Sequence, residues 1–126
     1  AKNFVCPSLF MAEELKRNGS RTWVYQFNRV RDDDLAKKYG AFHGAELPYV
    51  FDTHDEWLPT NKTDKVLTRE IQSYWLSFAK TGDPNNDGAV VWPEYESSND
   101  STLVLDDEIY QRGHESSEIC KIMDLF

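Results

Sequence analysis

The segment Gly40-Ala-Phe-His-Gly-Ala-Glu-Leu-Pro-Tyr-Val-Phe51 places a histidine between small residues and ends in an apolar run. Gly40 and Gly44 allow sharp or left-handed backbone turns on either side of His43. We expect the run Leu47–Phe51 to anchor this loop to a core. A histidine held in this way, with an ordinary pKa near neutrality, is suited to carrying protons in catalysis. The structural alternative is a partly buried histidine that only hydrogen-bonds a backbone carbonyl.

The composition of the chain is that of an acidic, folded protein. Its 126 residues are enough for one domain with one core. There are 14 Lys+Arg against 22 Asp+Glu, a formal net charge of -8. This balance argues against nucleic acids and anionic membranes as main partners. No apolar run approaches the ~20 residues of a membrane span, and the N-terminus lacks the pattern of a signal peptide.

Two cysteines and three glycosylation sequons indicate the compartment. Cys6 and Cys120 lie near opposite ends of the sequence, and two buried free thiols are one possibility. However, Asn-x-Ser/Thr sequons occur in polar segments at Asn18, Asn61 and Asn99. They favour a secreted glycoprotein, in which a Cys6–Cys120 disulfide is expected.

The order of apolar and polar segments predicts an α/β protein without internal repeats or an interdomain linker. The expected helices are Pro7–Arg17, Asp64–Lys80 and a last one from about Ser116, and the expected strands are Thr22–Asn28, Thr102–Asp106 and Ile109–Arg112. We expect Met11 and Leu15 on the inner face of the first helix. Apolar residues on both faces of Thr22–Asn28 predict a strand inside a sheet. The polar segments Arg29–Lys38 and 52–63 are expected to be loops.

The strongest helical pattern begins at Asp64, which is expected to cap the helix. Gly82 and Pro84 follow its end and stop it. Five large apolar residues recur at the helical period: Leu67, Ile71, Tyr74, Trp75 and Phe78. We therefore expect this helix to make a large core contact and to have a structural role.

Two acidic segments match metal-binding patterns. Asp83–Glu94 fits the calcium-loop pattern D-x-N-x-D-G with Glu at the twelfth position. Pro93 and the polar residues 97–100 leave no exiting helix, so we favour turn chemistry there over calcium binding. Likewise, we expect Asp32-Asp33-Asp34 to be a solvated loop. A calcium-binding module at 83–94 remains an alternative function.

Six short motifs follow one another along nearly the whole chain. They are Phe4-Val-Cys-Pro7, Thr22–Phe27, His43-Gly-Ala-Glu46, Trp75–Asn85, Val91-Trp-Pro-Glu-Tyr95 and Ile119-Cys120. Each is weak alone, but in this order they resemble the C-terminal part of the type-B carboxylesterase and cholinesterase family. In that family the first motif carries a cysteine of the last disulfide, and the third carries the catalytic histidine.

The resemblance implies an α/β-hydrolase fold, of which residues 1–126 form the C-terminal segment of a single domain. The chain would hold the last central-sheet strands with covering helices and be incomplete on its own. It also implies that His43 belongs to a Ser-Asp/Glu-His triad that hydrolyses carboxylic esters. No Gly-x-Ser-x-Gly occurs in the sequence, so the serine and the triad acid are expected from the remainder of the hydrolase domain, on a separate chain or in missing sequence. Glu46 is interpreted as a structural partner within the loop.

The same resemblance implies a small-molecule ester substrate and neither a cofactor nor a metal. We hypothesise that Phe42 and Trp57 border the substrate gorge. His54 and His114 lie in polar stretches without flanking glycines and are expected to be exposed bystanders. A non-catalytic relative that serves in adhesion or protein interaction is the main alternative function. The sequence leaves the identity of the ester and the oligomeric state open.

Overall fold

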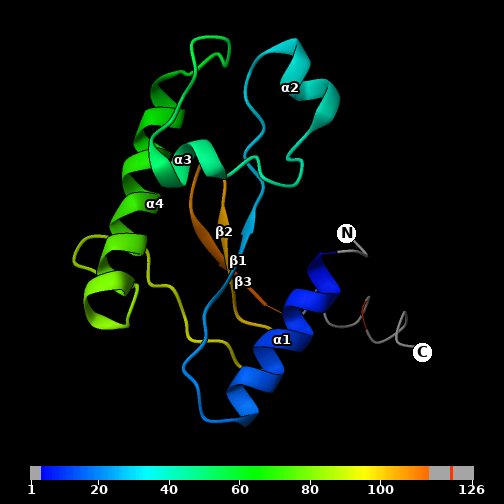
Figure 1. Cartoon of the computed structure of the whole chain (residues 1–126), viewed down its shortest axis with the longest axis vertical. Coiled ribbons are helices and arrows are strands. Elements are labelled where there is room, and N and C mark those ends of the chain that lie inside the picture. The colour runs from blue at the N-terminus through cyan, green and yellow to red at the C-terminus, as the bar shows by residue number, and fades with distance from the viewer. Residues whose placement is uncertain (1–3, 114–119, 121–126) are drawn as a thin grey trace. The chain divides into compact units, whose positions relative to one another are not determined.

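The computed structural model describes residues 4–113 and Cys120, which form helices and a small sheet (Figure 1). The elements in chain order are α1 (Val5–Arg17), β1 (Val24–Phe27), α2 (Asp34–Tyr39), α3 (Leu47–Phe51), α4 (Lys62–Thr81), β2 (Thr102–Leu105) and β3 (Tyr110–Arg112). The strands pair in the order β1-β2-β3. This confirms the expected α/β class and the two short strands after residue 100. The expected C-terminal helix from about Ser116 lies outside the described residues.

The chain divides into two compact units. One contains α1, the residues up to Gln26, the segment Trp92–Leu103 and the described residues from Gln111 on. The other comprises Phe27–Val91 and Val104–Tyr110, and it contains the histidine loop and α4.

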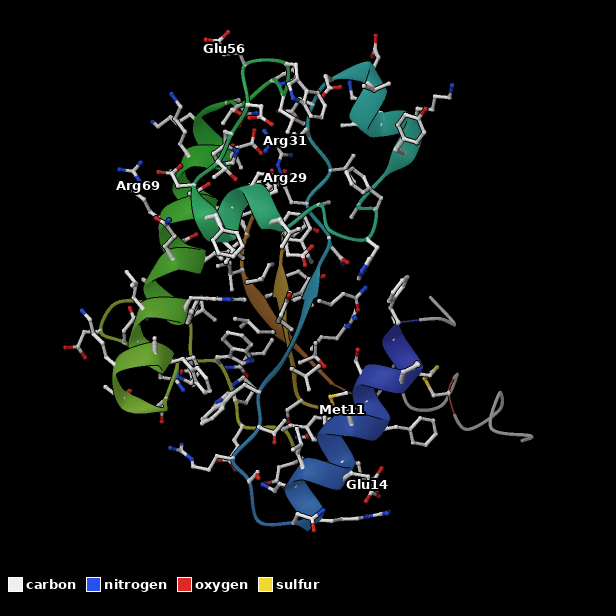
Figure 2. The ribbon with its side chains drawn as sticks, in the orientation of Figure 1. Met11, Glu14, Arg29, Arg31, Glu56 and Arg69 are labelled. Carbon is white, nitrogen blue, oxygen red and sulfur yellow. A yellow bond between two sulfur atoms is a disulfide. The ribbon has the colours of Figure 1, made fainter. Side chains whose placement is uncertain are left out.

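The core of the first unit is built on the disulfide-bearing face of α1. Cys6 is bonded to Cys120, with 5.5 Å between their Cα atoms, which confirms the expected pairing. Leu9 and Ala12 follow Cys6 at three-residue intervals and are buried with it. The expected inner face was wrong. Met11 is 65% exposed (Figure 2), and Leu15 is 43% exposed, because the disulfide turns the face containing Cys6 inward.

Residues 91–95, the motif around Trp92, are hydrogen-bonded to the start of β1 and to the residues just before it. The indole Nε1 of Trp92 donates to the carbonyl of Val24 at 3.0 Å, and the Tyr95 amide donates to the carbonyl of Thr22 at 2.7 Å. Trp92 and Tyr95 are both buried, and the Trp92 ring meets the Tyr25 ring edge-on at 6.1 Å. These contacts give the Trp-Pro-Glu-Tyr motif a structural role.

Strand β1, expected over Thr22–Asn28, is shorter and less buried than the sequence predicted. It spans Val24–Phe27, and all four residues are only half-buried, whereas β2 is buried throughout. The strand order explains the difference, because β2 is the central strand and β1 lies at an edge of this sheet.

In the second unit, α4 has a well-defined start and end. Asn61 is the N-cap: its side chain accepts from the Asp64 amide, while the Asp64 carboxylate accepts from the Asn61 amide. The helix therefore begins two residues earlier than expected, and Asp64 closes a capping box. At the other end, Gly82 adopts a left-handed φ of 76° and donates to the carbonyl of Phe78 at 2.8 Å.

The buried face of α4 agrees with most of the expected periodic residues. Leu67, Ile71 and Tyr74 are at most 1% exposed, while Trp75 is half-buried and Phe78 is 50% exposed. The last turns of the helix thus leave the core, and the prediction for Phe78 was wrong.

Two short helices on either side of the histidine loop were not expected. Asp34–Tyr39 forms α2 within the segment expected to be a loop, because the Asp33 carboxylate accepts from the Ala36 amide at 2.9 Å. The apolar run Leu47–Phe51 forms α3, in which only Tyr49 is buried. Asp33 and Asp34 therefore start a helix, and only Asp32 lies in the loop before it.

The segment matching the calcium-loop pattern is a turn. Asp83 Oδ1 accepts from the backbone and side-chain amides of Asn85, both at 2.9 Å. The hydroxyl of Ser77 donates to the carbonyls of Asp83 and Asn85. Residues 89–96 contain no helix, which agrees with turn chemistry at this place.

Candidate active site

His43 lies in the connection between α2 and α3, where consecutive turns fix the backbone. The Ala45 amide donates to the carbonyl of Phe42 at 3.0 Å, so His43 and Gly44 are the two central residues of a four-residue turn. Gly44 has a φ of 89°, the left-handed conformation that the third position of a type II turn requires. The His43 side chain is exposed. The turn thus presents the imidazole on the surface of this unit.

Both ends of this turn continue into hydrogen-bonded structure. Gly40 ends α2, with a φ of 65°, and its amide donates to the carbonyl of Ala36 at 2.7 Å. On the other side, the Leu47 amide donates to the carbonyl of Gly44 at 3.2 Å and begins α3. The peptide carrying His43 is therefore held between the end of α2 and the start of α3.

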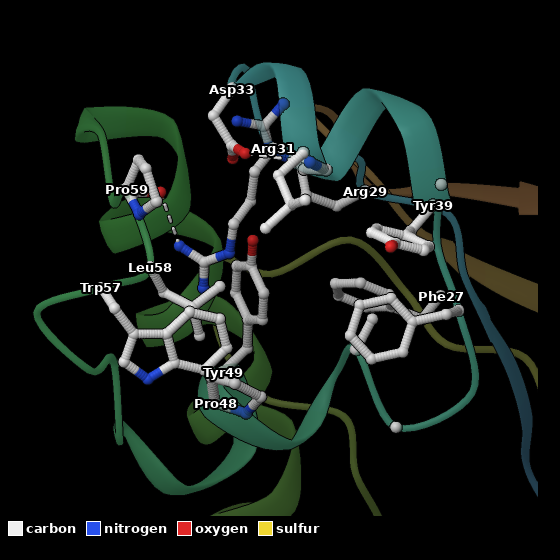
Figure 3. A pocket seen from close by; sticks show the side chains of 16 residues that line it. Phe27, Arg29, Arg31, Asp33, Tyr39, Pro48, Tyr49, Trp57, Leu58 and Pro59 are labelled. Carbon is white, nitrogen blue, oxygen red and sulfur yellow. Dashed lines mark hydrogen bonds between the residues drawn. The ribbon is translucent and has the colours of Figure 1, made fainter.

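An apolar cavity of about 360 Å³ lies beside the turn (Figure 3). Phe42 and Gly44, the immediate neighbours of His43, and the next residue, Ala45, contribute to its wall. The other lining residues are Phe27, Arg29, Arg31, Asp33, Leu35, Ala36, Tyr39, Gly40, Pro48, Tyr49, Trp57, Leu58 and Pro59. The structure therefore brings Phe42 and Trp57, which we expected near a substrate, to one cavity beside the His43 turn.

A buried ion pair and a tyrosine that bonds to it form part of the cavity wall, through Arg29 and Tyr49. Arg29 Nε donates to Asp64 Oδ1 at 2.9 Å, and the Tyr49 hydroxyl donates to the same oxygen at 2.7 Å. The side chains of Arg29 and Asp64 are 3% and 1% exposed. Burial alone would raise the pKa of the Asp64 carboxyl. Hydrogen bonds from Arg29, the Asn61 amide and Tyr49 outweigh it and hold that pKa below its ordinary value of 3.8.

Arg31 and His54 extend this polar cluster. Arg31 donates to Nδ1 of His54 at 2.8 Å, and Nε2 of His54 lies 2.7 Å from the Thr68 hydroxyl. Thr68 already donates its proton to the carbonyl of Asp64 at 2.7 Å, so it must accept from His54. Arginine only donates. His54 is therefore a neutral imidazole with its proton on Nε2.

The expectation that His54 is an exposed bystander was wrong. Its side chain is only 11% exposed. Burial, followed by the positive charge of Arg31, lowers the pKa of His54 below its ordinary value of 6.5. The polar residues around His54 in the sequence concealed this, because its partners come from distant segments. His114 lies outside the described residues.

The remaining predicted positions are not among the residues that line the cavity. Asn18 and Asn99 are exposed, whereas Asn61 is half-buried and caps α4. The Asn61 amide nitrogen also donates to Asp32 Oδ2. Glu46 precedes α3, and its backbone carbonyl accepts from the amides of Tyr49 and Val50. A structural role of its side chain stays a prediction.

The described residues contain neither a metal-ligand cluster nor a helix suited to a membrane. Within residues 4–113 and Cys120, no group of three or more His, Cys, Asp or Glu side chains is placed to hold a metal ion. Among the helices of that same part of the chain, none combines the length and the apolarity that crossing a bilayer requires.

Comparison with known proteins gives consistent matches. Para-nitrobenzyl esterase of Bacillus subtilis (strain 168) is 40% identical over 101 residues, covering 76% of this chain and 20% of that protein. Acetylcholinesterase of Gallus gallus is 32% identical over 130 residues, covering 98% of this chain and 17% of that protein. The chain thus spans about a fifth of the length of these relatives.

Solved esterase structures match the fold. A structure described as a thermophilic PNB esterase has a TM-score of 0.72 and 34% identity, covering 81% of this chain and 22% of that chain. An esterase from Clostridium hathewayi has a TM-score of 0.78 over 92% of this chain and 23% of its own, and its 22% identity speaks for the fold alone. The matched fold is that of the α/β-hydrolases. The family described as "Carboxylesterase family" matches residues 1–122, and the chain belongs to that family.

Proposed function

We propose that this chain is the C-terminal part of a secreted serine carboxylesterase and that His43 is the general base of its catalytic triad. The observation that carries the proposal is the position of His43. It occupies a glycine-containing, hydrogen-bonded turn whose neighbours Phe42 and Gly44 line an apolar cavity. Membership of the carboxylesterase family supports the reaction class. The short span of the relatives covered by the chain supports its being a part of a larger domain.

In this mechanism the nucleophile and the triad acid come from the remainder of the hydrolase domain. The His43 imidazole accepts the serine proton as the hydroxyl attacks the ester carbonyl, and it then protonates the leaving alcohol. Water then attacks the acyl-enzyme. His43 accepts a proton from this water and returns it to the serine as the acid is released. The acid fixes the tautomer of His43 through its other ring nitrogen. The turn's role is to hold the imidazole in one place through both steps.

The apolar cavity gives the second element of the proposal. Ring carbons of Phe27, Phe42 and Trp57 and the side chain of Leu58 supply surface for an apolar group of the ester. Because these residues lie beside the His43 turn, a bound acyl or alcohol group would place the ester carbonyl close to the base.

Secretion and glycosylation are part of the same proposal. The Cys6–Cys120 disulfide is typical of proteins that fold in an oxidising compartment. Asn18 and Asn99 are exposed acceptors for glycans. Asn61 stays a candidate, although its side chain is engaged at the start of α4.

A fluorophosphonate probe tests the serine mechanism in the complete protein. We expect one labelled serine outside residues 1–126 and loss of p-nitrophenyl ester hydrolysis in step with labelling. Full labelling that leaves the hydrolysis intact would contradict the mechanism. A complete protein with neither labelling nor hydrolysis would favour the non-catalytic adhesion or interaction module.

A further inference from the structure

One buried carboxylate oxygen binds both ends of the segment that carries His43. Arg29 stands at the start of this segment, two residues after the end of β1, and donates through Nε to Asp64 Oδ1 at 2.9 Å. Tyr49 stands near its end, in α3, and donates through its hydroxyl to the same oxygen at 2.7 Å. The other oxygen, Oδ2, accepts from the Asn61 amide at 2.9 Å. Residues 29 to 49 are thus tied at both ends to the start of α4.

These bonds are strong because of where they lie. The side chains of Arg29 and Asp64 are almost completely buried, and Tyr49 is 1% exposed. Water cannot replace a lost partner at such a site, so each buried group left unpaired is costly. The Asp64 carboxylate is therefore a fixed point in this unit.

The ring of Tyr49 is fixed as firmly as its hydroxyl. The Phe27 ring lies 5.0 Å away, the His54 ring meets it edge-on at 5.1 Å, and the Arg31 guanidinium lies 4.9 Å over its face. Figure 3 shows Tyr49 standing between Arg31 and Phe27. The position of α3 is consequently coupled to that of the buried cluster.

A continuous series of hydrogen bonds leads from Tyr49 back to the turn. The Tyr49 amide donates to Glu46, the Leu47 amide to Gly44, and the Ala45 amide to Phe42. His43 lies inside the last of these bonded turns. A shift of α3 would therefore be passed through these backbone turns to the position of His43.

We propose that Asp64, acting through Tyr49 and Arg29, is a positioning residue for His43. The inference rests on the proposed catalytic role of His43. Asp64 touches neither substrate nor the reacting atoms; it fixes the segment that presents the base. Loss of one end of this tie should lower turnover while leaving substrate binding and the fold largely intact.

The sharpest test compares two buried tyrosines in the complete enzyme. Tyr49→Phe removes only the hydroxyl that reaches Asp64 and keeps the ring. Tyr74→Phe is the matched control, because Tyr74 is equally buried and its hydroxyl donates to the carbonyl of Val90, outside the 29–49 segment. Both variants are assayed with a p-nitrophenyl ester well below their melting temperatures, with kcat per folded molecule and KM recorded separately.

We expect Tyr49→Phe to lower kcat by about tenfold or more, since small misplacements of a catalytic group are costly, with KM changed by less than about threefold. Tyr74→Phe should keep kcat within about twofold of wild type. Equal kcat values for the two variants would overturn the inference. Asp64→Asn, where it folds, should lower kcat at least as much as Tyr49→Phe, and a wild-type kcat would also overturn it.

His43→Ala separates this inference from the function on which it rests. If His43→Ala is inactive and Tyr49→Phe behaves like Tyr74→Phe, the positioning role alone fails. If His43→Ala stays active, both the proposed catalytic function and the positioning role of Asp64 are wrong.

Discussion

At the level of single residues, Gly44 sets the conformation of the turn that carries His43. A Cβ at this position would meet only Leu47 Cδ1, at 3.7 Å, which is an ordinary contact. The φ of 89° is what excludes other residues, because a side chain in the left-handed region costs about 1–2 kcal/mol. Glycine is thus required here for backbone conformation and not for space.

Gly44→Ala in the complete enzyme should lower both stability and turnover. Gly19→Ala is the control, because Gly19 also has a positive φ of 79° with nothing within 4 Å, and it follows α1 in the other unit. We expect similar falls in melting temperature for the two variants, but a fall in kcat only for Gly44→Ala. A Gly44→Ala enzyme with wild-type kcat would show that the turn does not determine the position of His43.

His54 should make the stability of the second unit decrease at acidic pH. Its folded-state pKa lies below 6.5, because burial and Arg31 oppose protonation. As pH falls below about 6.5, the unfolded chain therefore binds a proton that the folded chain resists. Stability supplied by neutral His54 is complete above that value and decreases as pH falls towards the folded-state pKa.

We expect melting temperatures measured from pH 8 to pH 5 to fall more steeply for wild type than for His54→Gln. Glutamine is always neutral and retains a donor and an acceptor for Thr68 and Arg31. Other groups that titrate in this range are common to both proteins, so the difference reports on His54. Parallel curves for the two proteins would contradict the assignment of a neutral, buried His54.

At the level of elements, the start of α4 connects the helix to the polar cluster. Asn61 and Asp64 exchange side-chain and backbone hydrogen bonds, and Asp64 also binds Arg29 and Tyr49. The same two helix-start residues therefore satisfy each other's backbone amides and bind the residues at both ends of the His43 segment.

Asn61→Ala should lower the free energy of unfolding by about 1 kcal/mol relative to Asn61→Ser, because serine is a good N-cap and alanine is a poor one. Both substitutions remove the sequon and the contact with Asp32, so the comparison isolates the cap. Thermal melting of the two complete proteins provides the measurement. Identical melting temperatures would mean that Asn61 does not contribute as a cap.

The elements that could be predicted from sequence are those with strong local signals. Helix α4 could be predicted because Leu67, Ile71 and Tyr74 recur at the helical period and Gly82 ends the pattern. In contrast, α2 is a six-residue helix without a buried residue, so no hydrophobic period marked it. The inner face of α1 was misjudged because a disulfide with a residue far along the chain decides which side is buried.

The candidate site was predictable to a similar degree. Glycines and a histidine in one short segment identified the turn, and Phe42 and Trp57 do line the adjacent cavity. The buried cluster around Asp64 was missed. Its members come from four segments of the chain, and Arg29, Arg31 and His54 look like ordinary polar surface residues in the sequence. Only the fold shows that they are buried together.

At the level of the whole molecule, the chain exposes many large apolar side chains. Examples with more than half of their surface exposed are Met11, Leu35, Tyr39, Phe51 and Trp57. Exposed apolar surface on this scale is typical of a region that packs against further protein. It agrees with the proposal that the remainder of a hydrolase domain covers the chain.

The chain produced alone should therefore be poorly soluble, bind hydrophobic dyes and show no burst of product with a p-nitrophenyl ester. Co-expression with the remainder of the hydrolase domain should suppress dye binding and restore hydrolysis. A monodisperse monomer that melts cooperatively and binds no dye would contradict the proposed incompleteness. Esterase activity of the chain alone would contradict the need for a serine from outside it.

The central claim is that His43 is the catalytic base, and turnover of His43→Ala in the complete enzyme tests it most directly. One imidazole on a turn contributes little packing, so the variant should melt like wild type. We expect kcat to fall by several orders of magnitude, because the serine loses its base and the leaving alcohol loses its acid. A His43→Ala enzyme that retains more than about a tenth of wild-type turnover, a change of less than ~1.4 kcal/mol in the barrier, would contradict the claim.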